Sequence, residues 1–140
     1  MEKLTFDNGM KSYRINGGGV LRFNPADPNV YARFLEGAKT LQAMEAELSA
    51  GASPVSALAE ADRKMKQVLN GIFGGENDFE ALLEGINLLA VAGNGERVIT
   101  NLLAALQPIM VAGAESCAKQ QTGAAVAEAK RNRAQRRAAK

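Results

Sequence analysis

Few residues in this chain could carry out chemistry. There is no histidine, which is the commonest general base and a frequent metal ligand, and there is a single cysteine, Cys117. A cysteine nucleophile needs a partner base, so Cys117 is expected to be a small apolar residue on a helix. A lone cysteine cannot form an internal disulfide, which argues against a secreted fold held together by disulfides.

The only cluster of carboxylates lies in the middle of the chain. Its members are Glu76, Asp78, Glu80 and Glu84. They surround the start of a predicted helix, where the helix dipole stabilises negative charge. No EF-hand loop or other cation-ligand spacing accompanies them. We therefore predict no catalytic residues, no metal site and no cofactor, and conclude that the protein is not an enzyme.

The run Asn16-Gly17-Gly18-Gly19 invites comparison with phosphate-binding loops. A P-loop needs a lysine and a hydroxyl at the start of the following helix, and neither is present. A dinucleotide fingerprint needs a helix directly after the glycines, whereas Val20–Phe23 has the composition of a strand. The glycines are therefore expected to form a turn with positive φ.

Positive charge is concentrated at the C-terminus. The net charge is +2, from 17 basic and 15 acidic residues. The last eleven residues contain six of the basic residues and no acidic one: Lys130, Arg131, Arg133, Arg136, Arg137 and Lys140. Without those six, 11 basic residues face 15 acidic ones, a net charge of −4. Such a tail could neutralise phosphates and bind nucleic acid in a salt-sensitive way. It lacks interleaved aromatic residues for base stacking, which favours a solvated tail or a contact with an acidic protein.

Residues 1–26 carry the signals for β structure. Leu4 and Phe6 alternate with polar neighbours and are followed by Asn8-Gly9, a strong two-residue hairpin signal. A second alternating stretch, residues 13–23, contains the glycine run. The pattern predicts two or three short strands in a hairpin or meander, covered on its apolar face by a helix.

Two amphipathic helices follow. Asp27-Pro28 supplies an N-cap and a first helical residue for a helix that ends near Ser49. Ser53-Pro54 repeats this device for a second helix ending near Phe73. The short connection predicts that the two helices are antiparallel neighbours. The charged residues of the second helix, Lys66 among them, are expected mostly off its apolar face.

Two further apolar stripes lie on either side of Gly93-Asn94-Gly95. The first begins at Phe79 and predicts a third helix that reaches these glycines; the second predicts a fourth helix with a kink at Pro108. Gly93-Asn94-Gly95 is either a plain interhelical turn or a hinge that lets the last helix dock on a neighbour. A partner-binding surface is expected on the second stripe, at Val98, Leu102, Leu103, Leu106, Ile109 and Met110.

The sequence thus predicts a mainly α fold, in which a small N-terminal β-hairpin or meander precedes a four-helix bundle and a basic C-terminal tail. Residues 1–116 are expected to form one domain, with the hairpin region in 1–26 and the bundle in 27–116. Residues 117–140 hold few large apolar side chains and should be flexible or helical. No apolar run of roughly 18 residues is free of glycine or polar interruption, so no membrane span is predicted.

The order of these parts resembles the small tail assembly chaperones of long, flexible-tailed bacteriophages and prophages. The resemblance covers roughly residues 1–116. It rests on the hairpin, the run Phe23-Asn-Pro-Ala-Asp-Pro-Asn29 and the run Ala92-Gly-Asn-Gly-Glu-Arg97.

The resemblance implies a non-enzymatic role in the cytoplasm of the bacterial host. Such chaperones bind the long helical tape-measure protein, keep its apolar surface soluble and deliver it to the tail-tube protein. They self-associate and often exist in short and frameshift-extended forms. The basic C-terminal run has no counterpart in this resemblance. It leaves open the alternative of a small phage-encoded nucleic-acid-binding protein that acts through its tail.

Overall fold

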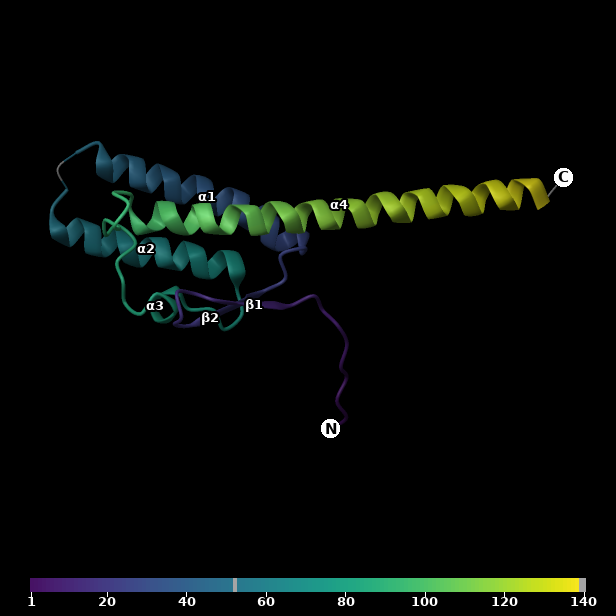
Figure 1. Cartoon of the computed structure of the whole chain (residues 1–140), viewed down its shortest axis with the longest axis horizontal. Helices are drawn as coiled ribbons and strands as arrows, with labels where there is room; N and C mark the ends of the chain where they lie inside the picture. The colour runs from purple at the N-terminus through teal and green to yellow at the C-terminus, as the bar shows by residue number, and fades with distance from the viewer. Residues whose placement is uncertain (52, 139–140) are drawn as a thin grey trace.

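The computed structural model describes residues 1–51 and 53–138, with only the backbone described at residues 124–125 and 136–138. The fold is mainly α, and an N-terminal hairpin precedes four helices, as predicted (Figure 1). In chain order the elements are β1 (Lys11–Arg14), β2 (Val20–Phe23), α1 (Pro28–Ser49), α2 (Val55–Phe73), α3 (Phe79–Leu82) and α4 (Val98–Ala138).

The hairpin is closed by the glycine run. β1 pairs antiparallel with β2, and Tyr13 lies opposite Leu21. The Ile15 N–H donates to the Gly19 carbonyl at 2.9 Å across the turn. Gly17 has a φ of 78°, in the left-handed region where glycine carries no steric penalty. The predicted positive-φ turn is confirmed.

Residues 1–10, called the N-terminal arm below, form no strand. Of the two or three strands predicted, the structure therefore has two. The stretch around Leu4 and Phe6 is not a strand, and these side chains are 89% and 72% exposed. Asn8-Gly9 does not turn the chain back on itself, and the arm leaves the body (Figure 1). A tertiary contact accompanies this course, because Asn24 Nδ2 donates to the Asn8 carbonyl at 3.1 Å.

The predicted N-cap is confirmed for α1 but not for α2. Asp27 caps α1 as predicted, its carboxylate accepting from the Asn29 N–H at 2.9 Å. Ser53 does not cap α2, so that prediction is wrong. Its hydroxyl donates to the Leu48 carbonyl, and Pro54 takes the N-cap position without a side-chain hydrogen bond.

α1 and α2 lie side by side and run in opposite directions, as predicted (Figure 1). Gly37 allows their close approach, because a Cβ there would overlap the end of the Ile72 side chain. Arg33 Nε also donates to the Ile72 carbonyl at 2.8 Å, which gives one carbonyl in the last turn of α2 a partner.

The third helix is much shorter than predicted and ends after a single turn, at Leu82. Glu84 and Gly85 adopt left-handed φ values of 54° and 77°, and the Gly85 N–H donates to the Glu80 carbonyl at 2.9 Å. These are the bonds of a helix terminus that ends in the left-handed region. Most of the stretch that follows, up to residue 97, is irregular although its apolar period is helical.

α4 is a continuous helix of 41 residues. Pro108 lies inside α4, where a kink was predicted, yet Figure 1 shows α4 without a sharp bend along its length. Pro108 is exposed, so the carbonyl that loses its helical partner lies on the solvent side, where water can bond it. The last part of α4, residues 117–138, extends beyond the body as helix, one of the two forms expected for the tail.

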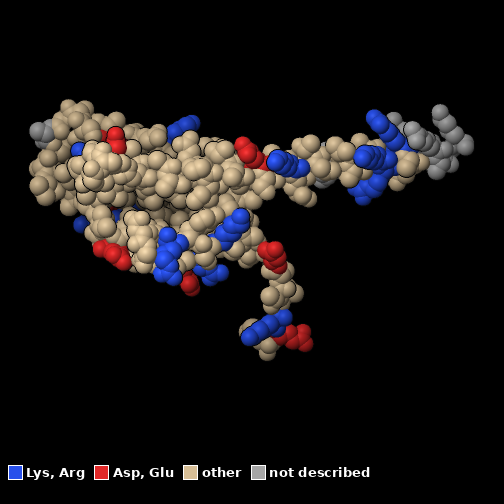
Figure 2. Space-filling model, viewed as in Figure 1, with Lys and Arg blue, Asp and Glu red and all other residues tan. Residues whose placement is uncertain are grey.

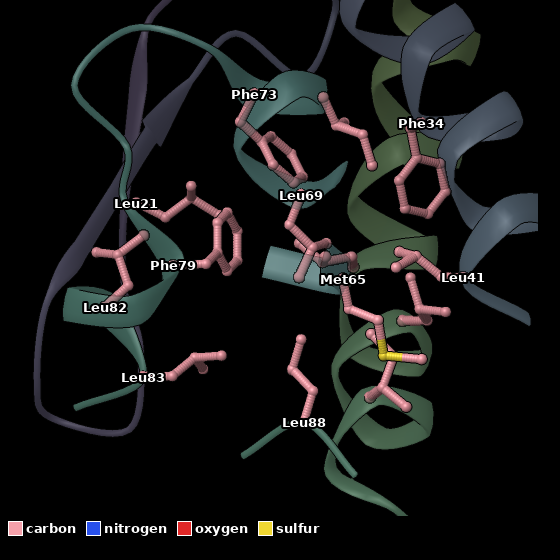
Figure 3. Close-up of a cluster of buried hydrophobic side chains, with 14 of the residues drawn as sticks. Leu21, Phe34, Leu41, Met65, Leu69, Phe73, Phe79, Leu82, Leu83 and Leu88 are labelled. Carbon is pink, nitrogen blue, oxygen red and sulfur yellow. The ribbon is translucent and has the colours of Figure 1, made fainter. Parts of the chain in front are cut away.

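One core joins the hairpin to the helices (Figure 3). Its fully buried large side chains are Leu21, Phe23, Leu41, Met65, Leu69, Phe79, Leu88, Ile99 and Met110. Aromatic rings form a continuous chain through it, with centroid distances of 5.2 Å for Tyr13–Phe23, 4.7 Å for Phe23–Phe73 and 5.6 Å for Phe73–Phe79. Such contacts add to the burial energy and fix the hairpin against α2 and α3.

Within the described residues, α4 over Val98–Gln135 is the one helix long and apolar enough to cross a membrane. A core helix of a soluble protein has the same properties. Ile99 and Met110 of α4 are fully buried against the rest of the domain. Packing in the core therefore accounts for these apolar residues of α4 without a membrane.

Candidate functional site

An apolar groove lies between the hairpin and the first half of α4. Its volume is about 400 Å³. We call it the hairpin groove; its lining residues are Tyr13, Arg14, Ile15, Asn16, Leu21, Leu83, Ala92, Val98, Asn101, Leu102, Ala105, Leu106 and Ile109. Most of these side chains are apolar, so the groove suits an apolar ligand or side chain better than a charged one.

The six residues predicted as a partner surface fall into two groups. Val98, Leu102 and Ile109 are half-buried and line the hairpin groove. The other three belong to the core: Leu103 is 8% exposed, Met110 0% and Leu106, which also lines the groove, 5%. The structure therefore does not show these three side chains on a free surface. The reason is that a helical stripe this wide has one edge in the core and the other on the groove.

The hairpin residues of the groove were not predicted to belong to a site. Tyr13 in β1 and Ile15 just after it are far from α4 in sequence, and both are half-buried against the core. Their alternation with polar neighbours was visible, but it indicated only a strand with one apolar face. The position of that face relative to α4 is a tertiary property.

A second hollow continues from the hairpin groove toward the C-terminal half of α4. Its volume is about 500 Å³, and Tyr13 and Ile109 line both hollows. We call it the lower hollow; its other lining residues are Lys11, Pro25, Ala26, Pro108, Ala112, Gly113 and Ser116. Gly113 sets its floor, because a Cβ there would overlap the backbone carbonyl of Pro25.

The predicted hinge, Gly93-Asn94-Gly95, forms a bonded turn. The Ala92 N–H donates to the Glu96 carbonyl at 2.7 Å, and the amides of Asn94 and Asn101 bond each other at 2.9 and 3.2 Å. These hydrogen bonds form a tight turn that leads into α4, which agrees with the interpretation of this run as a plain interhelical turn. A hinge motion stays a prediction.

The basic tail is part of α4. Lys130, Arg131 and Arg133 are exposed on the part that projects from the body (Figure 2). Lys140 and the side chains of Arg136 and Arg137 lie outside the described residues. The described side chains place three positive charges on a part of α4 that has no core beside it.

Lys66 is the one buried charged residue among those that the structure describes, although it was expected off the apolar face of α2. Its Nζ lies 2.9 Å from Asp62 Oδ2 and 2.5 Å from Glu80 Oε2. Burial alone would lower the pKa of Lys66, but the hydrogen bonds and charges of the two carboxylates raise it above its ordinary value. A lysine that stays protonated is neither a base nor a nucleophile, so the cluster is structural.

The same cluster holds the irregular segment after α3. Asp62 accepts the Leu88 N–H through Oδ1 at 2.7 Å while its Oδ2 faces Lys66. Leu88 and Leu89, only 0% and 3% exposed, are thereby held in the core without helical hydrogen bonds. The spacing of Asp62 and Lys66, four residues apart on one helix face, was the signal available in the sequence.

The remaining candidates for chemistry are dispersed. Asp78 accepts from the Glu80 N–H and caps α3, while Glu76 and Glu84 are exposed. Cys117 is a half-buried free cysteine on α4. Among the side chains that the structure describes, no three acidic or cysteine residues are grouped so that they could hold a metal ion.

Comparisons of the chain with known protein families, with curated proteins and with solved structures found no match.

Proposed function

We propose that this protein is a tail assembly chaperone of a long-tailed phage, acting in the host cytoplasm without catalysis. It binds an apolar helical stretch of the tape-measure protein, keeps it soluble and presents it to the tail-tube protein. The observation that carries the proposal is the hairpin groove, an apolar hollow of about 400 Å³ on the surface of a small helical domain.

The dimensions and chemistry of the groove favour a helix as its ligand. Val98, Leu102 and Ile109 offer apolar surface along about three turns of α4. An amphipathic helix that binds such a groove does so through anchors three or four residues apart. The apolar surface of a long helical tape-measure protein is where the proposal expects such anchors.

The chemistry of the described residues also favours binding over catalysis. Lys66, the one buried charge among the residues that the structure describes, is paired with carboxylates, and the four acidic residues of the central cluster do not converge. The proposal includes self-association of the chaperone, in keeping with the resemblance described above.

Co-expression with a tape-measure fragment tests the proposal. The proposal expects a very long, coiled-coil-rich reading frame beside this gene, and the fragment is to be taken from it. The chaperone should raise the soluble fraction of that fragment, and Leu102→Asp with Ile109→Asp should remove the effect because charge would enter the apolar groove.

A matched control uses the same helix. Ala104→Asp with Val111→Asp adds two aspartates at exposed positions that do not line the groove. This variant should keep the wild-type effect. Equal client solubility with both folded double variants would eliminate the groove as the binding surface.

The projecting basic helix favours one alternative function. Lys130, Arg131 and Arg133 are exposed and lie together on α4, so the protein could be a small phage-encoded nucleic-acid-binding protein. Binding to duplex DNA would then weaken steeply as salt rises. Truncation after Ala129 should abolish it; unchanged DNA binding by the truncated protein would exclude the tail as its cause.

A further inference from the structure

The free edge of the hairpin and the N-terminal arm are complementary, and neither has a partner strand among the described residues. Ile15 and Gly19 form a hydrogen-bonded position of the ladder. Hydrogen-bonded positions alternate along an antiparallel pair, so Tyr13 and Lys11 also bond β2. The backbone groups of Ser12 and Arg14 therefore face the open side of β1, and no described residue bonds them.

The opposite edge of the sheet shows how such groups are satisfied elsewhere in the fold. On β2 Val20 and Arg22 face outward, and the Asn77 side chain bonds both the Arg22 N–H, at 3.0 Å, and the Arg22 carbonyl, at 2.8 Å. Among the described residues, β1 has no such side chain beside it. An open edge of this kind is a template for pairing with another strand.

The open edge borders the lower hollow. Lys11 and Tyr13 of β1 line this hollow together with α4, and no residue of β2 does. A strand added to β1 would therefore place every second side chain over the hollow.

The N-terminal arm has the sequence of such a strand. Leu4 and Phe6 alternate with polar residues and are 89% and 72% exposed. If Thr5 pairs with Ser12, Leu4 lies opposite Tyr13 and Phe6 opposite Lys11, both on the face of the hollow. Phe6 would then contact the aliphatic stem and ammonium group of Lys11.

The arm is held away from its own edge. Asn24 Nδ2 donates to the Asn8 carbonyl, and the Asn24 side chain lies so close to Gly9 that a Cβ there would overlap it. A tight hairpin over Asn8-Gly9 needs positive φ at both residues, and Asn8 is not among the residues with positive φ. The arm consequently leaves the body (Figure 1).

We propose that the N-terminal arm pairs with the open β1 edge of a second copy of this chain, with Leu4 and Phe6 over that copy's lower hollow. Because each copy has one arm and one edge, a pair of copies can exchange arms symmetrically. In this register Lys3 faces Arg14 on the solvent side, where their repulsion is screened by salt. This exchange gives a geometry to the self-association included in the proposed function. It is tested at the arm and the β1 edge, so its failure is distinct from a failure of client binding in the hairpin groove.

Cysteine cross-linking between two different chains tests the exchange. In a Cys117→Ala background, a tagged Thr5→Cys chain is mixed with an untagged Ser12→Cys chain. The Cα atoms of a hydrogen-bonded pair lie about 5.5 Å apart, which suits a disulfide. A disulfide-linked heterodimer should form under mild oxidation. In the control, the untagged chain carries Gln42→Cys, on the exposed surface of α1, instead of Ser12→Cys. The heterodimer should form about tenfold faster with Ser12→Cys than with this control.

Two outcomes would overturn the proposal. One is cross-linking no faster with Ser12→Cys than with Gln42→Cys. The other is an intrachain disulfide in a monomeric Thr5→Cys/Ser12→Cys double variant without any mixed species, since the arm would then close on its own edge.

A second measurement uses exposed positions, so loss of folding cannot mimic the result. Leu4→Asp with Phe6→Asp should raise the dimer dissociation constant in sedimentation by about a hundredfold or more, because two apolar contacts per arm are lost. The thermal unfolding midpoint of the Leu4→Asp/Phe6→Asp variant should equal that of the wild-type monomer. Thr5→Asp, on the other face of the arm, is the matched control and should retain most of the association. Equal association of Leu4→Asp/Phe6→Asp and wild type would contradict the proposal.

Discussion

The side chain of Asn77 bonds the backbone of Arg22 as a neighbouring strand would. Its Oδ1 accepts the Arg22 N–H at 3.0 Å and its Nδ2 donates to the Arg22 carbonyl at 2.8 Å. The same Nδ2 also donates to the Gly74 carbonyl at 3.0 Å, at the end of α2. One side chain thus satisfies the β2 edge at Arg22 and fastens the two-stranded sheet to the end of α2.

Replacing Asn77 should destabilise the protein. Asn77→Ala removes the partners of the Arg22 N–H and carbonyl, and we expect a loss of about 1–3 kcal/mol in the free energy of unfolding. Urea titration followed by circular dichroism measures it. Asn94→Ala, which removes an exposed amide pair, is the control and should cost less. Equal losses would mean that the contact with Arg22 is not special.

Lys66 should be costly to remove. Lys66→Ala leaves Asp62, whose side chain is 13% exposed, without its cation, and it opens space in the core. We expect a loss of about 2–4 kcal/mol in the free energy of unfolding. Lys66→Met fills the space without the charge and should lose less. A Lys66→Ala protein as stable as wild type would show that the ion pair and its packing contribute nothing net.

The same residue predicts how stability responds to alkaline pH. The pKa of Lys66 is raised in the folded state, so the protonated side chain stabilises the fold. This contribution is complete below the ordinary value of 10.5 and is lost as pH rises through the folded-state pKa. Urea titrations at increasing pH should show a steeper alkaline loss for wild type than for Lys66→Met, in which the group is absent. Parallel curves would contradict this assignment.

Two glycines of α4 should respond oppositely to alanine. In a helix interior, Gly→Ala normally stabilises by about 0.5–1 kcal/mol. Gly123 has open space around it, so Gly123→Ala should show that gain. At Gly113 a Cβ would overlap the Pro25 carbonyl, so Gly113→Ala should instead destabilise, by about 1–3 kcal/mol. Thermal unfolding of both variants decides the sign; a gain at Gly113 would show that α4 does not contact the backbone at Pro25.

Features set by local chemistry followed from the sequence. The Asp27 N-cap, the glycine turn of the hairpin and the extents of α1 and α2 depend on residues next to one another in the chain. The apolar period of α4 likewise predicted a helix that must bury one face. Such signals involve only a few neighbouring backbone groups, and no distant contact overrides them in this fold.

Tertiary contacts decided the rest. The stretch after α3 has a helical period, yet its leucines are buried by an irregular segment, because Asp62 binds the Leu88 N–H from another helix. Asn24 holds the N-terminal arm away from the edge on which its pattern would place it. The groove exists only because β1 is placed beside α4. Burial and hydrogen bonding between residues far apart in sequence outweigh weak local preferences. A helical periodicity predicts that one face of a segment is buried, but it does not identify the residues that bury it.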